Sequence, residues 1–200
     1  KKQMTTQEGD NVGVCAIKGN FDDAQNGVKA IFTNREIAEE LEKNGMMFSS
    51  ANSINWGRLA PQIIYYISSY AQLLADGEIS EGEKINIVVP TGNFGNILAG
   101  YYAKHMGVPV NKLICASNAN NVLTDFLKTG IYDRNRDFHA TISPSMDILI
   151  SSNLERLLYM LSGENDALIR EWFGKLASEG IYEVSDDVKK ILFEEFSAGC

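Results

Sequence analysis

The 200-residue sequence has no long apolar run and no cluster of basic residues. A helix that crosses a membrane needs about 18–20 consecutive apolar residues, so we expect no membrane segment. Lysine and arginine together number 18 against 26 acidic residues, which gives a net charge of −8. This acidity disfavours nucleic acid as a partner, because phosphate backbones are bound through clustered positive charge.

Cysteine and histidine are scarce, with three and two residues respectively. Three cysteines cannot all be paired, and no spacing of cysteine and histidine is typical of a zinc site. Cys15 and Cys115 each lie in an apolar, strand-like stretch. We therefore expect buried, reduced thiols, no metal site and a cytoplasmic location.

Acidic residues are absent between Lys84 and Asp125, and a strand followed by a helix is predicted within this part of the chain. The β-branched residues of 85–89 predict a buried strand at the centre of a sheet, and Pro90 ends it. Apolar residues at helical spacing begin at Ile97. The turn between these two elements therefore opens a helix and carries no acid.

The uncharged turn reads Thr91-Gly92-Asn93-Phe94-Gly95-Asn96. The first N–H groups of a helix have no helical partner and attract anions, and glycine lets the backbone approach an anion closely. The turn therefore predicts an anion site, with the side chains of Thr91, Asn93 and Asn96 as further donors. The alternative is a plain tight turn capped by Asn93.

A second strand-to-helix turn contains the same Gly-Asn-Phe triplet, at residues 19–21. Asp22 and Asp23 follow it directly and fill the first turn of the predicted helix. Two carboxylates satisfy the positive end of that helix and repel a phosphate. Of the two turns, only the one at Gly92 is electrostatically open to an anion.

Strands and helices alternate through the first three quarters of the chain, which predicts an α/β fold with a parallel sheet and helices on both faces. Beyond the strand and helix already described, the pattern predicts strands at 12–17, 46–50 and 112–116 and helices at 22–32, after Asn34, at 56–75 and at 122–128. The tail is predicted to be helical, at 153–161, 167–178 and 185–196. Polar segments at Asn52, Gly92 and Asn118 each follow a predicted strand, so we expect them to line one crevice.

Two regions of different character are expected within the 200 residues. Residues 1–150 form the α/β core, and residues 151–200 form a helical extension. The chain begins at Lys1, and only about ten polar residues precede the first predicted strand. We interpret it as a piece of a longer protein.

Four long stretches resemble the threonine synthases of bacteria and fungi, which are fold-type II pyridoxal-phosphate enzymes related to the tryptophan synthase β subunit. These stretches are SSANSINWGRLAPQIIYY, VVPTGNFGNILAGYYAKHMGVP, ICASNANNVLTDFLKTG and ATISPSMDILISSNLERLL. The resemblance implies the cofactor pyridoxal 5′-phosphate and a lyase that converts O-phospho-L-homoserine and water to L-threonine and phosphate. It implies no particular oligomeric state.

The resemblance also implies roles for individual residues. Gly92, Asn93, Phe94 and Gly95 would hold the cofactor phosphate, flanked by Thr91 and Asn96. Asn52, Ser53 and Asn55 would lie near the cofactor or the substrate, unless they only cap the next helix. Ser145, Met146 and Asp147 are weaker candidates, and Asp147 is equally explained as a helix cap.

One feature of the family is missing from the 200 residues. The lysine that forms the Schiff base lies in a Phe-Lys-Asp segment, and a Ser/Thr-Gly-Asp-Thr-Gly loop follows it; neither occurs here. We expect both upstream in the full protein, and we expect this chain to be inactive alone. The alternative is a non-catalytic module that binds a phosphorylated ligand or regulates another protein.

Overall fold

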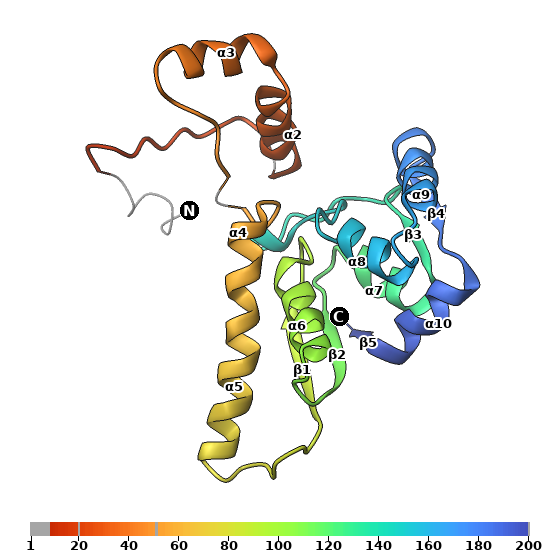
Figure 1. The fold of residues 1–200 in the computed structure, drawn as a ribbon. Coiled ribbons are helices and arrows are strands. Elements are labelled where there is room, and N and C mark those ends of the chain that lie inside the picture. Colours follow the sequence, from red (N-terminus) through yellow and green to blue (C-terminus); the bar gives the residue numbers. More distant parts are fainter. Residues whose placement is uncertain (1–8, 20, 51, 200) are drawn as a thin grey trace. The chain divides into compact units, whose positions relative to one another are not determined.

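The structure is a computed structural model that describes residues 9–19, 21–50 and 52–199 (Figure 1). The chain divides into two compact units, Lys1–Phe48 and Ser49–Cys200. The first unit contains helices α2 (Phe21–Phe32) and α3 (Arg35–Lys43). Both were predicted, and the Oδ1 atom of Asn34 caps α3 by accepting the Ile37 N–H at 3.1 Å, as expected.

The strands predicted at 12–17 and 46–50 do not form. Val12 makes only an isolated bridge with Gly9, and Val14 remains 44% exposed. A strand is stable only when a neighbouring strand completes its hydrogen bonds, and no described residue does so here. For the same reason the expected burial of Cys15 is wrong, because this thiol is exposed.

The acidic turn of the first unit has the character that its sequence predicts. A Cβ atom added to Gly19 would lie 2.7 Å from Oδ2 of Asp23, so a carboxylate lies against this turn. Asn20 and the side chain of Asp22 lie outside the described residues. The carboxyl group of Asp23 therefore lies beside Gly19, as the sequence predicts for an acidic turn.

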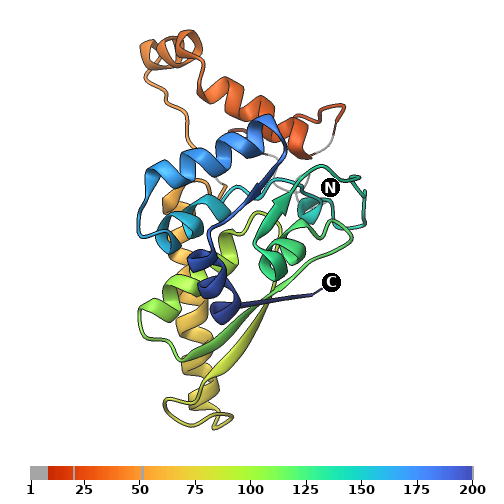
Figure 2. The ribbon, with the colours of Figure 1, turned by 90° about the vertical axis from the view of Figure 1, so that its right-hand side faces the viewer.

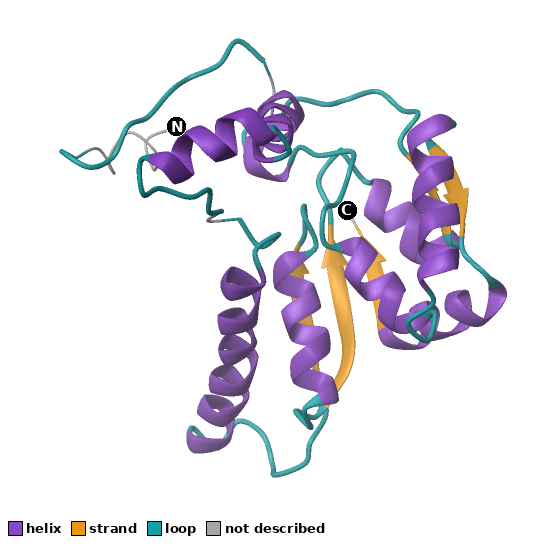
Figure 3. Ribbon diagram, turned by 45° about the horizontal axis from the view of Figure 1, so that its top comes forward, coloured by secondary structure: helices purple, strands orange, loops and turns teal. Residues whose placement is uncertain are grey.

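The second unit contains a sheet of three parallel strands, β1 (Ile85–Pro90), β2 (Val110–Ala116) and β5 (Phe196–Gly199), in the order β1-β2-β5 (Figure 3). The α/β fold with a parallel sheet is confirmed. The prediction that residues 85–89 form the central strand is wrong, because β2 lies in the middle and β1 at an edge. Val88 is accordingly 61% exposed.

The predicted helix at 56–75 forms as a rod of three consecutive pieces (Figure 1): α4 (Trp56–Leu59), a 3₁₀ turn η1 (Ala60–Gln62) and α5 (Ile63–Ala75). Pro61 lies in the 3₁₀ turn because its ring removes the N–H that an α-helix would use. The rod packs on α6 (Gly95–His105), where the ring of Tyr66 lies against Gly100. This contact positions the helix that begins at the uncharged turn.

The remaining helices lie near their predicted positions. They are α7 (Val122–Thr129), α8 (Leu154–Leu161), α9 (Asp166–Ser178) and α10 (Asp186–Glu195), and a short 3₁₀ turn, η2 (Pro144–Met146), precedes α8. Gly130 ends α7 with a φ of +76°, which glycine adopts without strain. None of the described helices is both long and apolar enough to cross a bilayer.

The sequence predicted a helical tail, but the structure also contains short strands there. The short strand β3 (Ile131–Asp133) pairs antiparallel with β4 (Ile181–Glu183), and β5 joins the main sheet beside β2 (Figure 2). Each is only three or four residues long, too short for a periodic pattern to identify. Their partners lie far away in sequence, so only the folded chain defines them.

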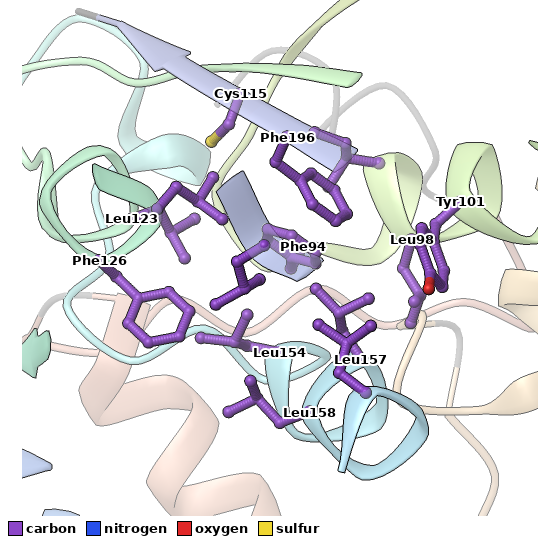
Figure 4. Close-up of a cluster of buried hydrophobic side chains, with 14 of the residues drawn as sticks. Phe94, Leu98, Tyr101, Cys115, Leu123, Phe126, Leu154, Leu157, Leu158 and Phe196 are labelled. Atoms are coloured by element: carbon purple, nitrogen blue, oxygen red, sulfur yellow. The ribbon is translucent and has the colours of Figure 1, made fainter. Parts of the chain in front are cut away.

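The core of the second unit joins the tail to the sheet. Leu154, Leu157 and Leu158 of α8 lie in one cluster with Phe94 of the uncharged turn and Phe196 of β5 (Figure 4). All five side chains are 2% exposed or less. Hydrophobic packing of Phe94 against residues of the tail therefore holds the turn at Gly92 in place.

Candidate functional site

The uncharged turn lies at the carboxyl edge of the parallel sheet. Strand β1 ends at Pro90, which is in register with Ala116 of β2. The ladder extends one residue further, since the Thr91 N–H donates to the Ala116 carbonyl at 2.9 Å. The Thr91 hydroxyl donates to the Val89 carbonyl at 2.7 Å, so its hydrogen is engaged within the strand end.

The path of the turn depends on Phe94, which has a left-handed backbone with φ +65° and ψ 2°. Few residues other than glycine adopt this conformation, and it is concentrated at functional sites. The buried Phe94 ring offsets this cost by packing in the hydrophobic cluster that also contains Leu98, Leu123 and Phe196, and its centroid lies 5.9 Å from that of Phe196 (Figure 4). A left-handed residue next to a right-handed one turns successive N–H groups toward one point, and Phe94 directly precedes the right-handed helix α6.

Five N–H groups of the turn donate to no partner among the residues that the structure describes; they belong to Gly92, Asn93, Phe94, Asn96 and Ile97. The N–H of Gly95 alone is satisfied locally, by Oδ1 of Asn93 at 3.0 Å. The cap expected of Asn93 therefore exists. It uses only one of the N–H groups at the start of α6.

The turn lines a cavity of about 200 Å³, which residues 90–97 form together with Ser145 and Met146. This volume is below the ~300–1,000 Å³ of pockets that enclose a whole drug-sized ligand, so it suits a compact group. None of the described residues that line the cavity is charged. A Cβ atom on Gly92 would lie 3.4 Å from the Cα of Met146 and would narrow the cavity.

Free N–H groups around an uncharged cavity fit a phosphate. Backbone dipoles at a helix start stabilise negative charge, and phosphate oxygens accept several hydrogen bonds at once. Burial raises the pKa of the nearby Cys115 thiol, against a smaller lowering by its hydrogen bonds with Thr91 and Ser117. The thiol is therefore neutral and places no charge beneath the turn.

Ser53 is the one residue of the 52–55 loop that reaches the turn. It is 7% exposed, and its Oγ would lie 2.4 Å from a Cβ on Gly95. Asn55 instead caps α4, because its Oδ1 accepts the Gly57 N–H at 3.0 Å. Asn52 folds the loop on itself by accepting the Ile54 N–H at 3.1 Å. The expectation that the segments at Asn52, Gly92 and Asn118 line one crevice is wrong, because only the segment at Gly92 lines the cavity and no described strand precedes Asn52.

Asp147 is buried and is not among the residues that line the cavity. Its carboxylate accepts hydrogen bonds from the Thr141 N–H and hydroxyl and from the side-chain amides of Asn118 and Asn120, at 2.7–3.2 Å. Burial on its own raises the pKa of Asp147, but these hydrogen bonds outweigh it and the pKa lies below its ordinary value. Asp147 therefore joins the loop after β2 to the loop that carries Ser145 and Met146.

Three residues around the site escaped the sequence analysis: Ser151, Asn153 and Arg156. Ser151 Oγ donates to the Gly92 carbonyl at 2.9 Å, and Asn153 Nδ2 donates to Ser53 Oγ at 2.9 Å. Arg156 donates to the Ser53 carbonyl at 2.7 Å and also bonds the Ile54 carbonyl. In the sequence, Ser-Ser-Asn before an apolar helix indicates only a cap, and nothing local indicates such distant partners.

Comparison with known proteins supports the motif resemblance. The chain is 44% identical to human "Threonine synthase-like 1" over 99% of its own length and 27% of that protein. It is 40% identical to the threonine synthase of Saccharomyces cerevisiae over 99% of its length and 39% of the enzyme. No protein-family model matches the chain. The chain thus spans about a quarter to two fifths of the curated relatives that it matches.

Solved structures give the same result for the fold. The pyridoxal-phosphate-bound threonine synthase of Brucella melitensis superimposes with a TM-score of 0.82 at 41% identity, covering 99% of this chain and 40% of that one. The yeast threonine synthase superimposes with a TM-score of 0.80 at 40% identity, with shares of 99% and 39%. The resemblance drawn from the sequence motifs is therefore confirmed.

Proposed function

We propose that this chain, homologous to part of the threonine synthases, is the segment of such an enzyme that holds the phosphate of pyridoxal 5′-phosphate. The full protein would be a lyase that converts O-phospho-L-homoserine and water to L-threonine and phosphate. The observation that carries the proposal is the set of five N–H groups at residues 92–97 that have no partner among the described residues and lie at a cavity that no charged described residue lines. The similarity to the pyridoxal-phosphate-bound threonine synthase supports pyridoxal 5′-phosphate as the ligand.

The residues of this chain would act on the cofactor by binding and orientation. The free amides of the turn would replace water around the phosphate oxygens, and the start of α6 would stabilise their charge. Because no charged residue lines the described part of the cavity, this chain would meet the phosphate charge with the fixed dipoles of the turn. Bound pyridoxal phosphate supplies an electron sink for carbanions formed on an amino acid.

Other parts of the same protein would complete the active site. The Phe-Lys-Asp segment of the family is not among these 200 residues, so the proposal places the Schiff-base lysine elsewhere in the full sequence. It follows that the 200 residues alone would not turn over O-phospho-L-homoserine. They would keep at most weak affinity for phosphate compounds.

The full-length protein tests the proposal through two paired ligands. Pyridoxine 5′-phosphate carries the phosphate but lacks the aldehyde, so it binds without forming a Schiff base, and pyridoxine lacks both groups. Calorimetric titration of the cofactor-free protein should show binding of the phosphorylated compound at least about tenfold tighter, which corresponds to about 1.4 kcal/mol. Equal affinities would overturn the assignment of the turn.

A turnover assay tests the reaction separately. The full-length protein, loaded with pyridoxal phosphate, should release threonine and phosphate from O-phospho-L-homoserine in equal amounts. Selective binding of the phosphorylated ligand without threonine formation would overturn the lyase and leave a module that binds phosphorylated ligands. The reaction should also stop when the lysine of an upstream Phe-Lys-Asp segment is replaced by alanine.

A further inference from the structure

Two carbonyl groups of the uncharged turn are held by the segment that precedes α8. Ser151 Oγ donates to the Gly92 carbonyl at 2.9 Å. Asn153 donates to the Asn93 carbonyl twice, from its backbone N–H and from Nδ2, each at 3.0 Å. Both donor residues are buried, Ser151 at 3% exposure and Asn153 at 0%. These bonds therefore form in a site shielded from water.

The held carbonyls determine where the neighbouring N–H groups point. In a trans peptide the C=O and the following N–H lie in one plane and point in opposite directions, and no peptide among the described residues is cis. The Gly92 carbonyl shares its peptide with the Asn93 N–H, and the Asn93 carbonyl shares its peptide with the Phe94 N–H. Both N–H groups therefore point away from Ser151 and Asn153, and neither has a partner in the described part of the chain.

Arg156 fixes the orientation of the Asn153 side chain. It donates to Oδ1 of Asn153, which leaves Nδ2 to face the Asn93 carbonyl and Ser53 Oγ. The same guanidinium bonds the carbonyls of Ser53 and Ile54. The network thus joins α8, the 52–55 loop and the turn, with Ser53 and Asn153 buried and Arg156 half-buried.

We propose that Ser151 and Asn153 are positioning residues of the phosphate site, which orient the Asn93 and Phe94 amides before a ligand arrives. Donors that are already aligned bind an anion more tightly, because binding then requires no reorganisation of the protein. Neither side chain is among the residues that line the cavity, so both act through the peptide groups. This inference rests on the proposed function.

Ser151→Ala in the full-length protein is the first test, because it removes one donor and adds no atom. We expect the affinity for pyridoxine 5′-phosphate to fall about tenfold, because one hydrogen bond that orients a binding group is lost. The affinity for pyridoxine should stay unchanged. The ³¹P resonance of bound pyridoxine 5′-phosphate should also shift, because the Asn93 N–H is no longer held in place.

Ser178→Ala is the matched control. The Ser178 hydroxyl also donates to a backbone carbonyl, that of Gly174 at 3.0 Å, but it is exposed on α9. It should change neither affinity nor the ³¹P resonance. Asn153→Asp is the second test, since it keeps the shape of the side chain while replacing the Nδ2 donor by an acceptor, and it should also weaken binding of the phosphorylated ligand alone.

The outcomes separate this inference from the proposed function. If the unmodified protein does not prefer pyridoxine 5′-phosphate to pyridoxine, the proposed function fails. If it does, and folded Ser151→Ala or Asn153→Asp protein keeps the original preference and ³¹P resonance, the positioning role is overturned. A loss of affinity for both compounds alike would also overturn it, because that pattern indicates general damage to the fold.

Discussion

Gly95 and Ser53 approach so closely that a Cβ atom on Gly95 would stand 2.4 Å from Ser53 Oγ and 2.7 Å from Ser53 Cβ. Real side chains do not reach such distances, so only glycine fits at the first position of α6 while Ser53 keeps its place. Ser53 is held from the other side by Nδ2 of Asn153 at 2.9 Å. The glycine in the family motif thus serves loop packing as well as close approach to an anion.

Gly95→Ala should therefore destabilise the protein by about 1–3 kcal/mol, the usual cost of adding a methyl group to a packed site. It should also weaken binding of pyridoxine 5′-phosphate, because Ser53 or the start of α6 must move. Urea denaturation and calorimetric titration of the full-length variant measure the two effects. Unchanged stability would contradict this prediction and would show that the 52–55 loop moves away from the added methyl group at little cost in free energy.

Gly174→Ala is the matched control for this glycine. Gly174 lies inside α9, and nothing stands within 4 Å of an added Cβ. Since alanine favours a helix over glycine, this variant should gain about 0.4–1 kcal/mol of stability and bind the ligand normally. If Gly174→Ala also destabilises the protein, the loss of stability in Gly95→Ala cannot be assigned to the contact with Ser53.

The elements that could be predicted from sequence are those with a strong local signal. The helix after Asn34 and the helix that ends at Gly130 have both a cap and a periodic apolar face, and both form. Strand β5 has only four residues and no such signal, because pairing with β2 creates it. The order β1-β2-β5 could not be predicted for the same reason.

The site residues could be predicted only where their role follows from one continuous stretch of sequence. The acid-free glycine turn at 92–96 could be identified because helix starts and glycines act locally. Ser151 and Arg156 could not be identified, because their partners lie on the turn and the 52–55 loop, far away in sequence. Asn55 looked like either a ligand or a cap, and in the structure it caps α4.

Asp147 gives a prediction about pH. Its pKa is lowered from an ordinary value of 3.8, so the folded protein binds this proton less tightly than the unfolded chain does. Its contribution to stability is complete above pH 3.8 and is lost as the pH falls through the lower pKa of the folded state. Asp147→Asn should cost about 1.5–3 kcal/mol at pH 7, the range for hydrogen bonds to a charged group.

The test of Asp147 is a difference between two proteins at two pH values. The stability gap between the original protein and Asp147→Asn, from urea denaturation, should be large at pH 7 and should shrink at pH 3. The exposed Asp76, replaced in the same way, should show a small gap at both values. A gap for Asp147→Asn that grows on acidification would contradict the assigned pKa direction.

Arg156 gives a prediction about the 52–55 loop. Its guanidinium bonds the Ser53 and Ile54 carbonyls together, a two-pronged contact that the single ammonium of lysine cannot reproduce. In Arg156→Lys protein the amides of Ile54 and Asn55 should exchange hydrogen about tenfold faster, which corresponds to about 1.4 kcal/mol of local stability. Hydrogen-exchange mass spectrometry of the full-length protein measures this.

Arg170→Lys serves as the control for Arg156. Arg170 pairs only with Asp166 among the described residues, and its side chain is 82% exposed. Exposed ion pairs contribute little, so exchange in the 52–55 loop should not change. If the amides of Ile54 and Asn55 exchange as slowly in Arg156→Lys protein as in the original protein, the loop is held by Ser53 and Asn153 alone.

Tyr66 supports the turn from α5. Its hydroxyl lies 2.7 Å from Oδ1 of Asn96 and 2.8 Å from the Asn96 carbonyl, and burial raises its pKa, so the hydroxyl stays protonated as a donor. Tyr66→Phe leaves these oxygens without that donor and should cost about 1–2 kcal/mol in urea denaturation. Tyr65→Phe on the same helix should cost less than about 0.5 kcal/mol, since Tyr65 is 61% exposed. Equal losses for the two variants would mean that the phenol contributes through its ring packing on Gly100, and not through Asn96.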